Sequence, residues 1–221
     1  MKKILALILA LATLFSLCAC GGTPSEDEIR GKQVTDEIIG EDEFSIGSAK
    51  GTVYESKFIG IGCNFPEGWT FYDEEQMKKL NEQSADLLDE DYLEALENAS
   101  VVQDMFAISA DSFSNINVSL EKVNPIQLAT LNVAKNFEAN AETLTQTYTN
   151  AGISDVTYEI GSVTIDGKTF TTFEIKANAI ITTLYQTLIG IKCNGYLATI
   201  AVTSNDKDTM KDLMDCFYLV K

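Results

Sequence analysis

The chain has 221 residues, of which 33 are acidic, 16 are basic and none is histidine, so its net charge is −17 at pH 7. A protein this acidic repels nucleic acids and anionic membrane surfaces, which excludes both as partners of its folded part. The lack of histidine excludes Ser-His-Asp and Cys-His catalytic sites and every zinc site that uses histidine.

Residues 1–19 have the pattern of a signal peptide. Two lysines precede an apolar or weakly polar core at residues 4–17, which is shorter than the roughly 20 residues that cross a membrane. Residues 17–20 read Leu-Cys-Ala-Cys and resemble the lipobox of bacterial lipoproteins. We therefore expect cleavage after Ala19 and lipid attachment to Cys20, which would hold the protein on the outer face of the cell membrane. Ordinary secretion is the alternative.

The composition changes near residue 50. Residues 20–51 are rich in acidic side chains, and their few apolar residues follow no pattern. Such a segment cannot offset the entropy lost on ordering, so we predict a flexible acidic linker that carries the lipid. Residues 52–221 then form one globular domain, which is long enough for a hydrophobic core of its own.

The first predicted strands are short. Residues 52–65 predict two strands with a kink at Gly60 or Gly62. Residues 65–68 read Phe-Pro-Glu-Gly, which fits a type I turn with proline second and glycine fourth.

The middle of the chain contains helix signals around a predicted hairpin. Asp73 and Gln76 have the spacing of a capping box, and the helical pattern after them extends to about residue 96. Residues 101–110 and 115–123 alternate as a hairpin does. Asn124-Pro125 begins the clearest helix and Gly152 ends it. Its apolar stripe consists of Ile126, Ala129, Val133, Phe137, Ala141, Leu144 and Tyr148.

The last part of the chain is mostly strands. Asp166-Gly167 and Asn194-Gly195 each separate two long strand patterns, which predicts two type I′ hairpins. The strand that follows residue 180 is apolar on both faces, so we expect it to be central and covered on both sides. Asn205 or Asp206 caps a final helix, and residues 217–220 close the chain as a short strand or a tail. The four hairpin strands are predicted at residues 156–165, 168–177, 180–193 and 196–204.

Two short motifs carry a resemblance to a known family. Residues 60–69, Gly-Ile-Gly-Cys-Asn-Phe-Pro-Glu-Gly-Trp, resemble the strand-Pro-x-Gly-Trp opening of PsbP/Mog1-like domains, and residues 210–217 are similar to their closing helix and aromatic residue. The whole chain resembles uncharacterised lipid-anchored proteins of Firmicutes. The resemblance implies an α+β fold, in which an antiparallel sheet with flanking helices forms an α/β/α sandwich. It also implies an accessory or binding module.

Aromatic residues and cysteines are the remaining candidates for a site. Trp69, Phe71 and Tyr72 are candidate ligand-facing aromatics, although such a cluster beside a turn is more often part of the core. Buried, inert thiols are the expectation for Cys63, Cys193 and Cys216. A disulfide between Cys63 and Cys193 is the alternative, since export permits it.

No metal or cofactor site is predicted. An acidic cluster lies between Asp86 and Glu97. It lacks the loop that calcium sites use, so a solvated helix face is the expectation and a weak cation site is the alternative.

Two functions from different classes follow from the sequence. The first is a non-enzymatic binding or interaction module, whose partner is an envelope protein or a small-molecule ligand. The second is a carboxylate-based hydrolase of cell-envelope glycans or peptides. That enzyme would need two carboxylates that face each other across a cleft.

Overall fold

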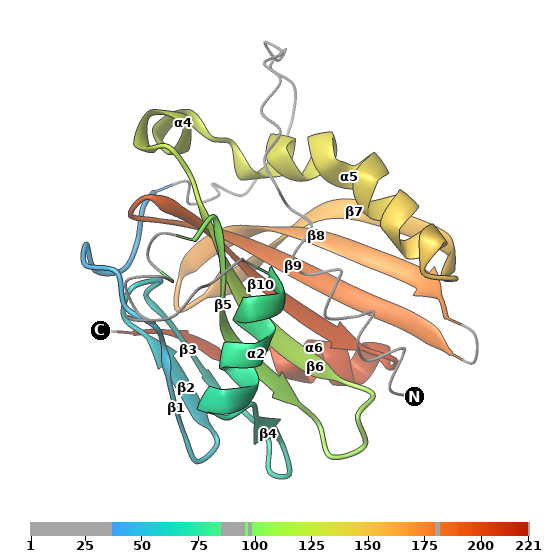
Figure 1. Ribbon diagram of the computed structural model, residues 1–221. Helices are drawn as coiled ribbons and strands as arrows, with labels where there is room; N and C mark the ends of the chain where they lie inside the picture. The colour runs from blue at the N-terminus through green and yellow to red at the C-terminus, as the bar shows by residue number, and fades with distance from the viewer. Residues whose placement is uncertain (1–36, 85–95, 97–98, 180–181, 221) are drawn as a thin grey trace.

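Figure 1 shows the computed structural model of the chain, which describes residues 37–84, 96, 99–179 and 182–220. Its strands form two antiparallel sheets, of four and seven strands, with helices packed beside them. The α+β class expected from the sequence is therefore confirmed. The resemblance to a known family implies one sheet, and the presence of a second sheet is a correction to that expectation.

The smaller sheet joins the two ends of the folded part. All of its neighbouring strands are antiparallel, and the C-terminal strand pairs with β3. The two strands predicted at residues 52–65 and the closing strand are confirmed. Gly60 lies between β2 and β3 with φ of 69°, and a Cβ there would lie 3.1 Å from the backbone nitrogen of Gly40. In spatial order the strands are β1 (Ser48–Lys50), β2 (Val53–Ser56), β3 (Ile61–Asn64) and β11 (Phe217–Leu219).

The larger sheet contains the predicted hairpins. Its pairs are all antiparallel, and the strand predicted after residue 180 lies inside the sheet between two long neighbours. In spatial order the strands are β4 (Thr70–Phe71), β5 (Val101–Ile108), β6 (Asn115–Lys122), β10 (Tyr196–Ser204), β9 (Thr183–Cys193), β8 (Lys168–Asn178) and β7 (Ser154–Ile165).

The two long hairpins turn differently. Asp166 and Gly167 have φ of 44° and 84°, as a type I′ turn requires, so that prediction is confirmed. At the other hairpin only Gly195 has a positive φ, 74°, so the type I′ prediction there is wrong. The Asn194 side chain donates instead to the carbonyl of Asp42 at 2.9 Å, a contact with the N-terminal segment that the local pattern cannot show.

The turn before β4 is displaced by one residue from its prediction. The Trp69 N–H donates to the carbonyl of Pro66 at 3.4 Å. Gly68 is therefore third in the turn, and its φ is 87°. A positive φ at the third position is the mark of a type II turn, which glycine adopts without strain.

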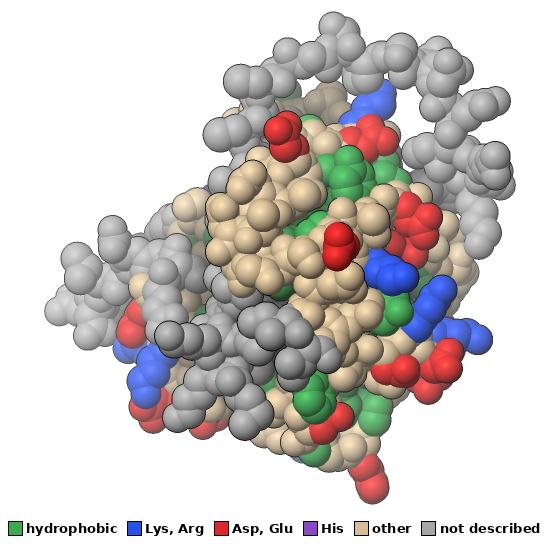
Figure 2. All heavy atoms as spheres, turned by 90° about the vertical axis from the view of Figure 1, so that its right-hand side faces the viewer, with side chains coloured by type: hydrophobic (Ala, Val, Ile, Leu, Met, Phe, Trp, Pro, Cys, Tyr) green, Lys and Arg blue, Asp and Glu red, His purple; other side chains and the backbone are tan. Residues whose placement is uncertain are grey.

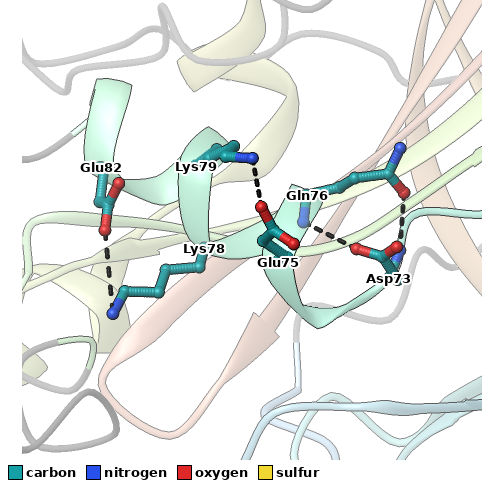
Figure 3. Close-up of polar contacts among 6 residues, drawn as sticks. All are labelled: Asp73, Glu75, Gln76, Lys78, Lys79 and Glu82. Atoms are coloured by element: carbon teal, nitrogen blue, oxygen red, sulfur yellow. Dashed lines mark hydrogen bonds and ion pairs between the residues drawn. The ribbon is translucent and has the colours of Figure 1, made fainter.

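Most helix ends lie where the capping signals predict them. Asp73 and Gln76 exchange two hydrogen bonds of 2.9 Å each, between side chain and backbone N–H, which confirms the capping box (Figure 3). Asp206 caps the last helix by accepting from the Thr209 N–H at 2.7 Å. Gly152, with φ of 81°, follows α5. The helices are α2 (Glu74–Ser84), α4 (Pro125–Thr130), α5 (Val133–Asn150) and α6 (Lys207–Met214).

The single long helix predicted after Asn124 is wrong, because it is divided into α4 and α5. Leu131 is extended, with φ of −63° and ψ of 124°, and its carbonyl accepts from Lys192 Nζ at 3.2 Å. Asn132 starts α5 by accepting from the Lys135 N–H at 2.9 Å. Ile126, predicted in the stripe, is 80% exposed, and Ala129 is exposed as well. The buried part of the stripe is Val133, Phe137, Ala141, Leu144 and Tyr148.

Hydrophobic cores lie on both faces of the seven-stranded sheet. One core fills the space between the two sheets and includes Ile189 and Ile191 of β9. The other lies beneath α5, which crosses above the sheet in Figure 1, and includes Leu184 and Leu188 of the same strand. The prediction that this strand is covered on both sides is therefore confirmed.

The folded part begins earlier than the sequence predicts. Residues 37–51 pack on the domain, so the flexible-linker prediction is wrong for them, and residues 20–36 lie outside the described part. Ile39 is buried, and its N–H donates to the backbone of β9 at 3.0 Å. The Phe44 ring stacks on that of Tyr196, with 5.3 Å between the centroids. Few residues of the segment are apolar, so its composition does not indicate that they pack on the domain.

Candidate ligand cavity

A cavity of about 430 Å³ is lined by residues of α2 and β5, among others. These two elements pack beside each other (Figure 1). Its lining includes exposed residues, which form the rim, and buried residues, which form the floor. The wall comes from β1, β2, β4, β5, α2 and the segments before β1 and α2. The lining residues are Ile46, Gly47, Ala49, Tyr54, Phe71, Tyr72, Asp73, Glu74, Met77, Asn81, Gln103, Asp104, Met105 and Phe106.

A β-bulge in β5 places Asp104 at the floor. Gln103 lies opposite Ser119 and Met105 lies opposite Val118, so Asp104 is the extra residue between them. The backbone of Gln103 is held by Asn81 of α2. The Gln103 N–H donates to Asn81 Oδ1 at 2.7 Å, and Asn81 Nδ2 donates to the Gln103 carbonyl at 3.0 Å. Bulges often redirect a side chain beside a functional site. The sequence pattern predicts a regular strand here and does not find Asp104.

Asp104 is a buried acid with two hydrogen-bond donors. Its Oδ1 accepts from the Gly47 N–H at 2.8 Å, and its Oδ2 accepts from the hydroxyl of Tyr54. Burial raises the pKa of Asp104 to about 6, while these two hydrogen bonds hold it lower than burial alone would. Burial, with Asp104 beside it, raises the pKa of Tyr54 well above its ordinary value. At neutral pH the floor therefore holds one carboxylate and one neutral phenol.

Gln103 is a lining residue whose side chain carries a further polar group. The side chain is buried, and its Nε2 has no hydrogen-bond partner within the part of the chain that the structure describes. A buried donor without an acceptor costs free energy. A cavity-lining residue with such a donor is a reason to look for a ligand acceptor there.

Two of the three aromatic residues singled out from the sequence line the cavity. Phe71 and Tyr72 do so, and the Tyr72 ring lies with its centroid 4.4 Å from that of Phe106. Trp69 is not a lining residue. It packs on Phe65, with 5.3 Å between the ring centroids, at the margin of the core between the sheets.

The cysteines lie apart from the cavity lining and are free thiols. Cys63 and Cys193 are buried and form no disulfide, so the disulfide alternative is wrong. The Cys63 thiol hydrogen-bonds that of Cys216, and this bond together with burial raises the pKa of Cys63. Burial raises the pKa of Cys193 to about 12. Thiols with raised pKa values are poor nucleophiles at neutral pH, as expected for Cys63 and Cys193. Cys216 differs from the expectation, because it is only partly buried and its hydrogen bond with Cys63 lowers its pKa.

Several predicted features lie outside the described residues, among them Cys20 and most of the acidic cluster between Asp86 and Glu97. Across residues 37–84, 96, 99–179 and 182–220, no group of three or more cysteine or carboxylate side chains gathers as a metal site would require. None of the helices in this part of the chain is both long and apolar enough to cross a membrane.

Charges of both signs are spread over the face that lies to the right in Figure 1. Figure 2 shows acidic side chains scattered over this face with basic side chains among them.

Comparison with known proteins assigns no family. No known family profile matches the chain, and no curated protein is similar to it in sequence. A solved structure from Bacteroides thetaiotaomicron VPI-5482 is similar to this chain, with a TM-score of 0.40 and 10% sequence identity. The match covers 78% of the chain described here. The same match covers 50% of that protein, so the chain spans about half of its length.

Proposed function

We propose that the protein is an extracytoplasmic lipoprotein whose folded part binds a ligand without catalysing a reaction. The cavity of about 430 Å³ supports this best, because an exposed rim leads to a floor of buried polar groups. Ligand sites typically measure roughly 300–1,000 Å³ and combine apolar walls with a few polar groups. The partner is a small molecule or an envelope protein that meets the domain at the membrane surface, and no cofactor is required.

The membrane anchor is the second part of the proposal. The sequence Leu-Cys-Ala-Cys at residues 17–20 supports lipidation of Cys20 after removal of residues 1–19. A diacylglycerol group supplies two chains, which is enough for stable anchoring. Motifs at residues 60–69 and 210–217 further suggest a PsbP/Mog1-like domain, and the antiparallel strands and flanking helices are compatible with that assignment.

A hydrolase is the second candidate, and one observation favours it. A carboxyl with a pKa of about 6 suits general acid catalysis. The enzyme would need a second carboxylate, and the candidates are Asp73 and Glu74 at the rim. Asp73 is engaged as the cap of α2, and both oxygens of Asp104 already accept hydrogen bonds. Binding therefore explains the arrangement with fewer requirements.

Tryptophan fluorescence tests the choice between binding and hydrolysis. Trp69 is the only tryptophan, and its ring packs on that of Phe65. The Phe65 ring in turn packs on that of the cavity residue Phe71, with 4.9 Å between the ring centroids. We expect fractionated envelope components to change the fluorescence of the full-length protein saturably and to be recovered unchanged. Turnover of a glycan or peptide that Asp104→Asn abolishes would overturn the binding function in favour of the hydrolase.

The anchor has its own test. We expect Cys20→Ser to release the protein from membranes or to leave the precursor uncut. If the variant is processed and still sediments with membranes, the proposed attachment through Cys20 is wrong.

A further inference from the structure

The cavity is lined by acids and aromatic rings. Three of its lining residues, Asp73, Glu74 and Asp104, are acidic, and no lysine or arginine is among the lining residues that the structure describes. Because the pKa of Asp104 is about 6, this carboxyl is ionised at pH 7.5. The cavity thus attracts positive charge and repels anions.

The lysines of α2 do not cancel this negative charge. Lys79 Nζ lies 2.5 Å from a carboxylate oxygen of Glu75, and Lys78 Nζ lies 4.0 Å from one of Glu82 (Figure 3). Both lysines are therefore balanced by acids of their own helix. Glu74 is left as a rim acid beside the capping residue Asp73.

Gln103, the lining residue that precedes Asp104 in β5, carries a buried side-chain donor. The unpartnered Nε2 of Gln103 requires an acceptor, while the neighbouring Asp104 attracts a charged donor. This pair of adjacent residues selects a ligand that carries a cation and an acceptor close together. The observation is independent of the acidic character of the rim.

The apolar part of the lining determines what kind of cation fits. Phe71, Tyr72, Met77 and Phe106 present rings and a thioether, and aromatic faces attract organic cations. A calcium ion would need six to eight oxygen ligands. No such group of acids gathers among the described residues, so the lining disfavours a bare metal ion.

We infer that the cavity binds a small organic cation, namely a protonated amine on an apolar body with a neutral hydrogen-bond acceptor close to the amine. The amine lies toward Asp104, the acceptor takes a hydrogen bond from Gln103, and the apolar body lies against Phe71 and Tyr72. This inference rests on the proposed binding function of the cavity and adds the chemical class of the ligand.

Three related probes test the class of ligand by calorimetric titration of the full-length protein in a non-ionic detergent at pH 7.5. Phenylalaninamide has the amine, the carbonyl and an apolar ring; N-acetylphenylalaninamide lacks the cation; phenylalanine adds a carboxylate. We expect phenylalaninamide to bind at least about tenfold more tightly than the other two. Equal or tighter binding of the neutral amide would overturn the cationic class and leave the binding function in place.

A substitution at the rim of the cavity tests whether phenylalaninamide binds there, and it leaves the core unchanged. Glu74 is exposed, so Glu74→Gln leaves the fold intact, and we expect it to weaken phenylalaninamide about threefold. Glu138 on α5 is exposed and not a lining residue, so Glu138→Gln makes the same change in charge and is the matched control. Equal effects of the two variants, or no binding of phenylalaninamide, would overturn the inference. The binding function would then be judged by the envelope titration with Trp69.

Discussion

Asp104 is a carboxylate in the interior of the domain, where an unpaired charge is costly. The Gly47 N–H and the Tyr54 hydroxyl each donate to one of its oxygens, and together they offset part of that cost. Its pKa nevertheless remains near 6, so burial outweighs the two hydrogen bonds. Retaining such a residue lowers stability near neutral pH, which is consistent with a role in binding.

Replacing Asp104 should change how stability depends on pH. The folded state raises the pKa of Asp104 from 3.8 to about 6, so it favours the protonated form. The contribution of Asp104 is therefore fully present below the unfolded pKa and is lost as the pH rises through the folded pKa. We expect the wild type to lose stability relative to Asp104→Asn as the pH rises. In urea melts, the difference between their unfolding free energies (wild type minus variant) should fall by roughly 2–3 kcal/mol between pH 4 and pH 7.

Asp111 provides a control with the opposite sign. Hydrogen bonds from the Ser109 hydroxyl and the Phe113 N–H lower the pKa of this exposed acid. Its contribution to stability is present above its unfolded pKa and is lost as the pH falls through the folded pKa. The difference in unfolding free energy between the wild type and Asp111→Asn should grow as the pH rises. If the difference between the wild type and Asp104→Asn also grows with rising pH, the argument that burial raises the pKa of Asp104 is wrong.

Packing of α5 on the larger sheet shows how helix and strand fit each other. Gly190 of β9 lies beneath the start of the helix, where a Cβ would lie 2.4 Å from Val133 Cγ1 and 3.2 Å from the Phe137 ring. Only a residue without a side chain allows this close approach. The break at Leu131 turns the start of α5 onto this position, and Lys192 holds the break by donating to the Leu131 carbonyl.

Truncating the centre of the helix face should be costly. Phe137 is 1% exposed and contacts Phe173 with 5.6 Å between the ring centroids. We expect Phe137→Ala to lower the unfolding free energy by about 3–5 kcal/mol, because it leaves a cavity in the core. Lys135 is exposed on the same helix, so Lys135→Ala should cost at most about 0.5 kcal/mol. Equal losses in urea melts would contradict this assignment of faces.

A methyl group at Gly190 should also destabilise the helix contact. We expect Gly190→Ala to cost about 1–3 kcal/mol, because Val133 and the strand would have to move apart. A Cβ at Gly51 would meet no atom within 4 Å, but the φ of Gly51 is positive, 64°, so Gly51→Ala tests backbone strain alone. If Gly190→Ala leaves the thermal midpoint unchanged, the close approach is wrong.

The N-terminal segment links the two sheets into one molecule. Ile39 is bonded to the backbone of β9, Phe44 packs on Phe58 and Tyr196, and Gly47 donates to Asp104. The segment therefore completes both the core and the floor of the cavity.

Two truncations test this role. A chain that starts at residue 37 keeps these contacts, and we expect its unfolding free energy to match that of the full-length protein. A chain that starts at residue 52 loses Ile39 and Phe44 and leaves Asp104 without the Gly47 donor. We expect it to lose at least about 4 kcal/mol. Equal urea midpoints for the two chains would refute the role of residues 37–51.

Local signals in the sequence predicted many of the elements. The Asp73–Gln76 capping box, the Asp206 cap and the Asp166-Gly167 turn depend on residues within three positions of one another, and all three are confirmed. The α+β class was implied by the resemblance of residues 60–69 and 210–217 to a known family. Phe71 and Tyr72 are candidates from the sequence because aromatic residues beside a turn are visible in it.

Tertiary structure decided the features that depend on distant residues. The bulge at Asp104 arises from the pairing of β5 with β6 and from Asn81 of α2, and no residue next to Asp104 signals it. The partner of its carboxylate, Gly47, is 57 positions away and lies in a segment that composition alone predicts to be a linker. Local propensity therefore determined where elements begin and end, whereas burial and long-range hydrogen bonds determined which residues meet at the cavity.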